Sequence, residues 1–392
     1  MLRQIVCFQV PSFHIAIARA QTAALRSYPV GVAPPTARAV LFEVSAEAVA
    51  EGVCAGMSLD LARLRCPGLK IIAPQSESVP AAHAAVLESL RYFSPIWEPI
   101  RPGHFYLDLT GTARLFGRAV DTAARMEKEV LARHRLSGVA GVATNKLVSH
   151  IAADAILKPP DLCGVDPGAE KTFLAPQPVV ALPALHRLCG GKTPEFLEML
   201  TELDLSTLGK VAATPPGHLE LVVGTRSRLM QQWAAGFDPT PVWPAERRPS
   251  LEMSYTLTPD EVDDAALCAA LYGLLERLCR QLRGAERLCV GVRLDLVQTD
   301  GVEFSGRAPV VPTQWECDLY PPLEKLYFRL FQRRVRIRKI VLTAEKLEEK
   351  SRQLSLFPER RAEEDLKQER LAAALDGVRA RYGKDAVVWG SA

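Results

Sequence analysis

The order of the apolar segments along this chain constrains its fold more than any other feature of the sequence. Within the first 160 residues, short apolar runs that favour strands mix with longer amphipathic stretches that follow the helical period. The clearest strands are Gln4 to Val10, Leu69 to Ala73 and Gly138 to Ala143, and the clearest helices are Ala81 to Phe93 and Thr112 to His134. A strict βαβ winding needs strands and helices in regular alternation. The mixed order therefore predicts an α+β fold.

Residues 248 to 346 show a second pattern. It predicts, in order, a strand from residue 248, the helix Asp263 to Arg283, the strands Val290 to Gln298 and Gly301 to Ala308, the helix Leu323 to Arg333 and the strand Val335 to Thr343. A βαββαβ order is typical of small split-βαβ domains. Between the two patterns, residues 167 to 237 contain short helical segments broken by Pro and Gly, and the proline-rich residues 238 to 247 indicate a linker.

The overall composition is that of an ordinary globular protein. The chain has 392 residues, of which 48% are apolar and 24% charged, and this length suffices for two to four domains with their own cores. A net charge of +3 supplies no global basic field, so any contact with DNA must come from a local patch. The sequence contains no uninterrupted run of about 18 apolar residues, so no membrane span is predicted.

The cysteines point to a reducing compartment. All nine are scattered without a C-x-x-C pair, which argues against a zinc ribbon or a thioredoxin-type site. Apolar runs such as Ile5 to Phe8 contain some of them, as expected of reduced thiols that pack as small apolar residues. The first residues lack a basic segment followed by a long apolar core, so no signal peptide is predicted. We expect a cytoplasmic protein.

A short apolar peptide lies in a charged, proline-ended stretch near the end of the sequence. Its residues are Gln353, Leu354, Ser355, Leu356 and Phe357. Charged neighbours cannot bury three large apolar side chains, so the peptide is either the edge of a local helix or strand, or it docks into a groove on another protein. The peptide resembles the QL(S/D)LF pattern by which bacterial DNA polymerases and repair proteins bind the sliding clamp. In that reading the glutamine hydrogen-bonds the rim of the groove, and Leu and Phe fill its apolar pocket.

Several segments of the N-terminal half, taken in order, resemble the Y-family (translesion) DNA polymerases. Ile5 to Phe13 resembles the strand that runs into D-x-D-x-F-F in active members. The fingers motif Y-E-A-R-x-x-G-V-x-x-G-M is similar to Glu47-Ala48, Gly52-Val53 and Gly56-Met57. Three further motifs, C-P-x-L, E-P-x-S-x-D-E-A-Y-L-D-x-T and G-I-A-x-N-K … K-P, are similar to Arg65 to Leu69, Glu98 to Thr110, and Gly141 to Lys146 with Lys158-Pro159.

This resemblance implies the Y-family architecture of palm, fingers, thumb and little finger. The palm would comprise residues 1–12 and 74–166, and the fingers residues 13–73. The helical thumb would span 167–237, followed by the linker at 238–247 and a βαββαβ little finger at 248–346. The tail, 347–392, would carry the clamp-binding peptide and one helix.

The catalytic positions depart from the family pattern. Active Y-family polymerases hold two Mg²⁺ ions with acidic side chains, whereas this chain has Gln9 for the first Asp and Gly103 and His104 for the Asp-Glu pair. An amide, a glycine and an imidazole supply no negative charge for a hard cation. Asp108 cannot replace them, because four residues along a strand place it roughly 13 Å away. The sequence therefore predicts a palm without catalytic residues.

Nucleotide binding is also predicted to be lost. The Tyr and Arg that contact the triphosphate in the family correspond to Ala46 and Val49, which leaves Lys158 as a residual phosphate-binding candidate. We predict no cofactor and no metal site. Because the sequence places no second His, Cys or carboxylate at ligand spacing, we interpret His104 as a partly exposed structural histidine.

A Y-family scaffold without catalytic carboxylates but with a clamp-binding peptide resembles the ImuB group, and Val10-Pro11-Ser12-Phe13 is similar to its V-P-A-F segment. The resemblance implies a non-catalytic bacterial subunit for error-prone translesion synthesis and mutagenesis in the SOS response to DNA damage. Its partners would be DNA, the sliding clamp, an error-prone C-family DNA polymerase and an ImuA-type, RecA-like protein. Two alternatives remain: an active Y-family polymerase with unconventional metal ligands, and a DNA-binding regulator independent of the clamp.

The densest basic run predicts a DNA contact. It contains Arg333, Arg334, Arg336, Arg338 and Lys339. Alternation along a strand would place Arg334, Arg336 and Arg338 on one face, where they could follow a phosphodiester backbone without reading bases. The alternative is a solvated sheet face balanced by nearby glutamates.

Overall fold

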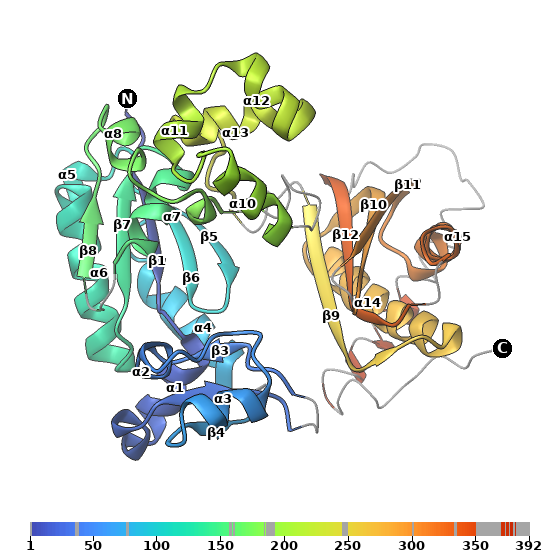
Figure 1. Cartoon of the computed structure of the whole chain (residues 1–392). Helices are drawn as coiled ribbons and strands as arrows, with labels where there is room; N and C mark the ends of the chain where they lie inside the picture. Colours follow the sequence, from blue (N-terminus) through green and yellow to red (C-terminus); the bar gives the residue numbers. More distant parts are fainter. Residues whose placement is uncertain are drawn as a thin grey trace. The chain divides into compact units, whose positions relative to one another are not determined.

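The structure is a computed structural model that divides the chain into two compact units, Met1–Arg248 and Pro249–Ala392 (Figure 1). It describes residues 2–35, 39–75, 78–156, 159, 161–183, 185, 193–244, 250–299, 302–332 and 335–349, together with 370–372, 374, 375, 377, 378 and 381. No helix among these residues is long and apolar enough to cross a membrane.

A five-stranded sheet forms the centre of the first unit. Its order is β5-β6-β1-β7-β8, with bounds Ile96–Arg101, His104–Asp108, Ile5–Gln9, Val139–Ala143 and Asp161–Gly164. Strand β1 is antiparallel to both of its neighbours and is buried along its whole length, in agreement with the buried strand predicted for Gln4 to Val10. The strand therefore presents side chains to both faces of the sheet.

Helices cover both faces of this sheet. On one face, Val6 and Phe8 share an apolar cluster with residues of α1 (Phe13–Gln21), α4 (Ser78–Leu90) and α6 (Ala119–His134). On the other face, α7 (Lys146–Asp154) packs against β1 and β7. Asn145 caps α7, because its side chain accepts a hydrogen bond from the amide of Val148. Figure 1 shows α7 beside β7.

Two smaller groups of elements complete the first unit. A three-stranded sheet, β3-β2-β4, has short strands at Glu43–Val44, Val30–Val32 and Lys70–Ile72; the helices α2 and α3 of this region span Ala46–Ala50 and Leu59–Arg65. A helical group follows β8 and shares one apolar cluster with α7; its α-helices are α8 (Glu170–Leu174), α10 (Thr193–Glu202), α11 (Leu208–Ala213), α12 (Pro216–Val223) and α13 (Ser227–Ala234).

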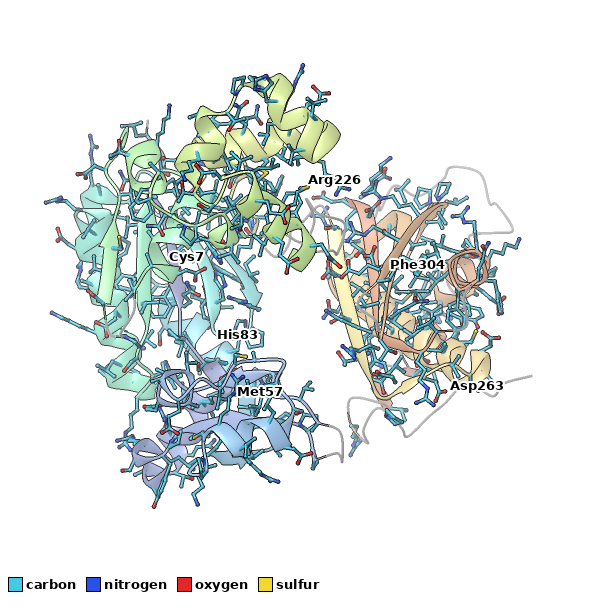
Figure 2. All side chains as sticks on the ribbon, in the orientation of Figure 1. Cys7, Met57, His83, Arg226, Asp263 and Phe304 are labelled. Atoms are coloured by element: carbon cyan, nitrogen blue, oxygen red, sulfur yellow. The ribbon has the colours of Figure 1, made fainter. Side chains whose placement is uncertain are left out.

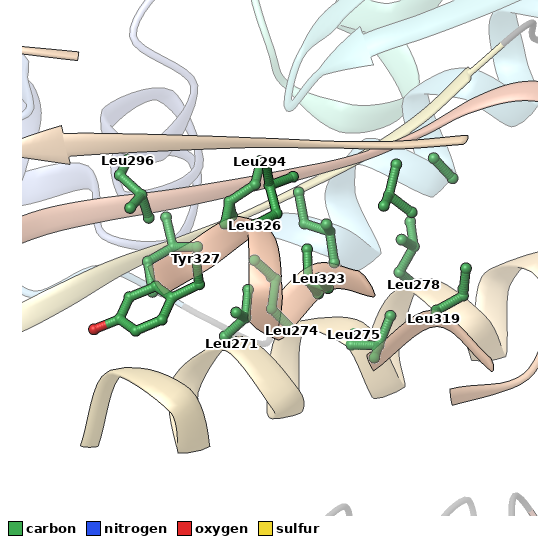
Figure 3. Close-up of a cluster of buried hydrophobic side chains, with 14 of the residues drawn as sticks. Leu271, Leu274, Leu275, Leu278, Leu294, Leu296, Leu319, Leu323, Leu326 and Tyr327 are labelled. Carbon is green, nitrogen blue, oxygen red and sulfur yellow. The ribbon is translucent and has the colours of Figure 1, made fainter. Parts of the chain in front are cut away.

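The second unit has the βαββαβ order that the sequence predicts. Its elements are β9 (Ser250–Glu261), α14 (Asp264–Gly284), β10 (Arg287–Gln298), β11 (Glu303–Thr313), α15 (Glu316–Leu330) and β12 (Ile337–Glu349), and its sheet order is β11-β10-β12-β9. Leucines of α14 and α15 pack with Leu294 and Leu296 of β10 in a buried core (Figure 3).

Several element bounds in the second unit differ from prediction, most of all those of α15 and β12. Helix α15 begins at Glu316 rather than Leu323, although it contains Pro321 and Pro322, because Leu319 in its first turns is fully buried in the core. Strand β12 begins two residues later than predicted and extends to Glu349, where it pairs with Arg287 of β10. Burial in the core and pairing with distant segments set these bounds, and the local sequence pattern does not reveal either.

Candidate functional site

The structure brings the three predicted catalytic positions together at one end of the central sheet. Gln9 and His104 are directly paired across β1 and β6, and Gly103 precedes β6 in the turn that connects it to β5. The amide of Val10 donates to the carbonyl of Gly103 at 2.8 Å, which extends the pairing past the end of β1. The three positions that correspond to metal-binding residues in the family are thus neighbours in space.

Gln9 is buried and bound to a carboxylate that the sequence reasoning missed. Its amide nitrogen donates a hydrogen bond of 2.7 Å to Asp154, the last residue of α7. The other oxygen of Asp154 lies 3.1 Å from Nε2 of His150, one helical turn earlier. Burial acts to raise the pKa of Asp154, but the hydrogen bonds from His150 and Gln9 outweigh it and lower this pKa. Asp154 is therefore held in its charged form.

The prediction of a partly exposed His104 without nearby ligands is wrong. His104 is 2% exposed, its Nε2 lies 3.2 Å from Sγ of Cys7, and its ring stacks on that of His150 with centroids 4.9 Å apart. Figure 2 shows Cys7 on β1, inside the first unit. Burial, followed by the proximity of His150, lowers the pKa of His104 to about 3, so the ring is neutral at physiological pH. The predicted absence of neighbouring ligands failed because pairing of β1 with β6 and packing of α7 bring distant residues together.

Gly103 occupies a backbone conformation that suits glycine. Its φ is +74°, in the left-handed region. Its amide donates to Nδ1 of His83 at 3.1 Å, and the His83 ring stacks on Phe105 with centroids 4.6 Å apart. The turn between β5 and β6 is therefore fixed by His83 of α4, which Figure 2 labels.

A buried ion pair lies beside these residues. Lys146 lies 2.7 Å from Glu98 of β5, and both side chains are almost fully buried. Glu98 also accepts the amide of Trp243 at 2.8 Å. Lys146 sits over the ring of Tyr106, whose hydroxyl lies 3.0 Å from Nδ1 of His150.

We call this set the polar layer. It comprises Cys7, Gln9, Glu98, His104, Tyr106, Lys146, His150 and Asp154. The three α7 members are spaced by four residues, so they share the helix face that meets the sheet. That spacing is the signal in the sequence that could have found them.

Asp108 lies at the far end of β6 from His104. It pairs with Ile5, and its carboxylate accepts the amide of Thr110 at 2.9 Å. This carboxylate therefore stabilises the turn after β6 and lies outside the polar layer, as strand geometry predicts.

Ala46 and Val49, at the two positions that contact the triphosphate in the family, carry no charge. Ala46 lines an open cavity of about 600 Å³ together with Pro11, Ser12, Ile15 and Arg19. The guanidinium of Arg19 donates to Glu47 and to the carbonyls of Leu25 and Tyr28. Val49 is exposed, and Lys158 lies outside the described residues.

The basic run of the second unit is only partly described. Arg336 and Arg338 are exposed and Lys339 is half-buried, whereas Arg333 and Arg334 lie outside the described residues. Arg336 and Arg338 lie on either side of the buried Ile337, and the pairing of β12 with β9 shifts register between Ile337 and Lys339. Arg338 lies 3.6 Å from Asp260, so part of its charge is balanced within the sheet. The peptide Gln353, Leu354, Ser355, Leu356 and Phe357 also lies outside the described residues.

Two family models match the chain. Residues 8–154 match the impB/mucB/samB family, and residues 248–356 match the impB/mucB/samB family C-terminal domain. A DNA polymerase IV from Dehalococcoides mccartyi is 27% identical over 395 residues, covering 99% of this chain and 97% of its own length. A DNA polymerase IV from Desulfatibacillum aliphaticivorans is 25% identical and covers 98% of this chain and 95% of its own length.

Solved structures share the fold. A Y-family DNA polymerase chimera of Dbh and Dpo4 matches with a TM-score of 0.68 at 18% identity, over 88% of this chain and 99% of its own. DinB from Sulfolobus solfataricus matches with a TM-score of 0.63 at 18% identity and the same coverage. The predicted α+β fold with Y-family polymerase architecture is thereby confirmed over most of the chain.

Proposed function

Because the chain belongs to the impB/mucB/samB family and is a Y-family polymerase-like protein, we propose that it is a non-catalytic DNA-binding adaptor in translesion synthesis. One observation carries the proposal. Gln9 and His104 face each other where the family resemblance expects metal-binding carboxylates, and Gln9 contacts Asp154 while His104 contacts Cys7 and Arg101.

The chemistry of these contacts supports a palm that does not catalyse phosphoryl transfer. Two Mg²⁺ ions bridging a triphosphate need several anionic oxygens at about 2.1 Å. Among the residues that the structure describes, Asp154 is the carboxylate hydrogen-bonded to Gln9, and its two oxygens are bound by Gln9 and His150. Nε2 of His104 contacts the Sγ atom of Cys7, and nitrogen and sulfur are poor ligands for Mg²⁺.

The adaptor would act by tethering. A peptide contact of Gln353 to Phe357 with the sliding clamp and a backbone contact of the basic run with DNA are each weak. Carried by one chain, they reinforce each other through a raised effective concentration. The bound partners, an error-prone C-family polymerase and an ImuA-type RecA-like protein, would then be delivered to clamp-loaded DNA, and the C-family polymerase would perform the synthesis.

Primer extension tests the catalytic part of the proposal. Purified protein is incubated with a labelled primer-template, all four dNTPs and Mg²⁺ or Mn²⁺, with a relative named DNA polymerase IV as positive control. We expect no nucleotide addition by this chain. Addition that co-purifies with the protein through successive columns would overturn the proposal.

Calorimetry with the purified sliding clamp tests the tethering part. Deletion of residues 353–357 is expected to abolish binding, and the double substitution L356A/F357A to weaken it at least tenfold, because the apolar anchors supply most of the affinity of such peptides. The matched control is S355A, which removes one hydroxyl and keeps all three apolar side chains. Unchanged affinity after the deletion would favour the clamp-independent DNA-binding regulator.

An active polymerase is the second candidate. The naming of relatives as DNA polymerase IV, with matches over nearly their whole length, favours it. It would require metal ligands other than the residues at positions 9, 103 and 104, and primer extension separates the two candidates directly.

A further inference from the structure

We propose that Cys7, His104 and His150 form a binding site for a soft or borderline transition metal, with Zn²⁺ as the best fit, in the polar layer of the palm. Their ligand atoms, Sγ of Cys7, Nε2 of His104 and Nδ1 of His150, all lie within 4.8 Å of one another. This is the one such trio of His, Cys, Asp or Glu among the described residues.

The separations fit a tetrahedral ion. With Zn–S at about 2.3 Å and Zn–N at about 2.05 Å, tetrahedral angles place sulfur and nitrogen about 3.6 Å apart. In the structure, Sγ of Cys7 lies 3.2 Å from Nε2 of His104 and 3.9 Å from Nδ1 of His150, on either side of that value. One imidazole therefore needs to move slightly outward and the other slightly inward.

The surrounding residues orient one ligand for metal. Nε2 of His150 lies 3.1 Å from the carboxylate of Asp154, which accepts a hydrogen bond from Gln9 on its other oxygen. When Nε2 of His150 carries the ring proton and donates a hydrogen bond to Asp154, Nδ1 keeps its lone pair and faces Cys7. A carboxylate that holds the second ring nitrogen is the arrangement typical of metal-bound histidine. In the metal-free cluster the lone pair of Nδ1 accepts from the hydroxyl of Tyr106, 3.0 Å away, so the hydroxyl proton has to turn aside when a metal binds.

Charge balance also favours a divalent ion. Cys7 is fully buried beside His104, and a cysteine that binds a metal does so as a thiolate. Metal binding replaces the thiol proton, and the thiolate together with Asp154 then supplies two negative charges against a 2+ ion. Asp154, whose side chain is 42% exposed, is the most exposed member of the polar layer and brings it close to solvent at the end of α7.

Arg101 opposes the metal-bound form. Its Nε donates to Nδ1 of His104 at 3.2 Å, so the neutral ring carries its proton on Nε2. Binding through Nε2 moves that proton to Nδ1, where it would face another donor. Arg101 is exposed and can turn away, but R101Q, whose amide oxygen can accept from Nδ1, should bind the metal more tightly by about tenfold, as for other residues that orient a metal ligand.

Cobalt substitution tests the site. The full chain is stripped with a chelator and titrated with Co²⁺, then Zn²⁺ is added in competition. We expect one equivalent of Co²⁺ to bind with release of one proton, tetrahedral d–d bands and a thiolate-to-cobalt absorption band, and we expect Zn²⁺ to displace the Co²⁺ without further proton release. C7S should lose the thiolate band, and D154N should weaken binding by about 10- to 100-fold.

The matched control is C66S, which alters another fully buried cysteine outside the polar layer and should leave the titration unchanged. X-ray absorption of the zinc-loaded wild type gives a readout that needs no variant to fold, with one sulfur and two imidazole nitrogens expected. A shell of nitrogen and oxygen only, or a thiolate band that C7S retains, would overturn the proposal.

Discussion

Gly103 and Phe13 are so close that a side chain at position 103 would collide with the ring. A Cβ atom built on Gly103 would lie 2.5 Å from Cδ2 of Phe13, and the φ of +74° adds backbone strain for any other residue. The position that the family resemblance assigns to an acidic residue is thus closed by the packing of α1 against the β5–β6 turn.

We therefore expect G103A to destabilise the first unit by about 2–5 kcal/mol, since left-handed backbone costs about 1–2 kcal/mol and overpacking adds about 1–3 kcal/mol. G111A is the matched control, because Gly111 has a φ of +83° but no atom within 4 Å of its Cβ position. Urea unfolding of both variants measures the difference. Equal losses would show that Phe13 moves aside at no cost.

Gln9 and Asp154 predict the effect of restoring an acidic residue at position 9. Q9E would place a second carboxylate at hydrogen-bond distance from Asp154, and like charges there should cost about 1–3 kcal/mol at pH 7. Repulsion raises the pKa of the pair in the folded state, so the penalty is present above that pKa and is relieved as the pH falls through it.

The double variant Q9E/D154N serves as the control, because the asparagine amide can donate to the new carboxylate. Stability near the wild-type value is expected for the double variant, measured by urea unfolding at pH 7 and pH 5. A double variant less stable than Q9E alone would contradict the assigned hydrogen bond.

Removal of one member of the Lys146–Glu98 pair should cost more stability than removal of one member of an exposed pair. K146M leaves the Glu98 carboxylate buried with only the amide of Trp243, and loss of one member of a buried pair costs about 3–5 kcal/mol. R133M on α6 is the control, since Arg133 and Glu129 form an exposed helical pair worth about 0.5 kcal/mol. Thermal melts that rank the two variants equally would contradict this account.

His83 should make stability depend on pH. Burial lowers its pKa in the folded state, and its neutral Nδ1 accepts the amide of Gly103. The unfolded chain then binds the proton more readily, so this contribution is complete above the unfolded pKa of about 6.5 and is lost as the pH falls below it. H83N retains an acceptor but does not titrate, and its stability should fall less than that of the wild type between pH 7 and pH 5. Parallel pH profiles would exclude this role for His83.

How much of this structure the sequence predicts depends on the distance over which each element is determined. Strand β1 and helix α14 follow from local apolar patterns, and the βαββαβ order follows from their succession. The contact of Cys7 with His104 joins residues 97 positions apart, and it arises only when β1 pairs with β6. No local pattern encodes that register. The spacing of Lys146, His150 and Asp154 on one helix face was visible, but nothing in the sequence showed which strand they would meet.

The ion pair of Arg338 with Asp260 leads to the last prediction, which concerns DNA. Each phosphate contact contributes about 0.9 to the slope of log K against log salt concentration. Because Arg338 is exposed but lies 3.6 Å from Asp260, D260N should free the charge of Arg338 and strengthen DNA binding at low salt, whereas R338Q should weaken binding and reduce the slope by about one.

R133Q in the first unit is the control for loss of one exposed arginine. Fluorescence anisotropy with labelled primer-template DNA over a salt series measures all three variants. If R338Q and R133Q have the same slope as the wild type, Arg338 makes no phosphate contact, and the basic run is a solvated sheet face balanced by its own acidic neighbours.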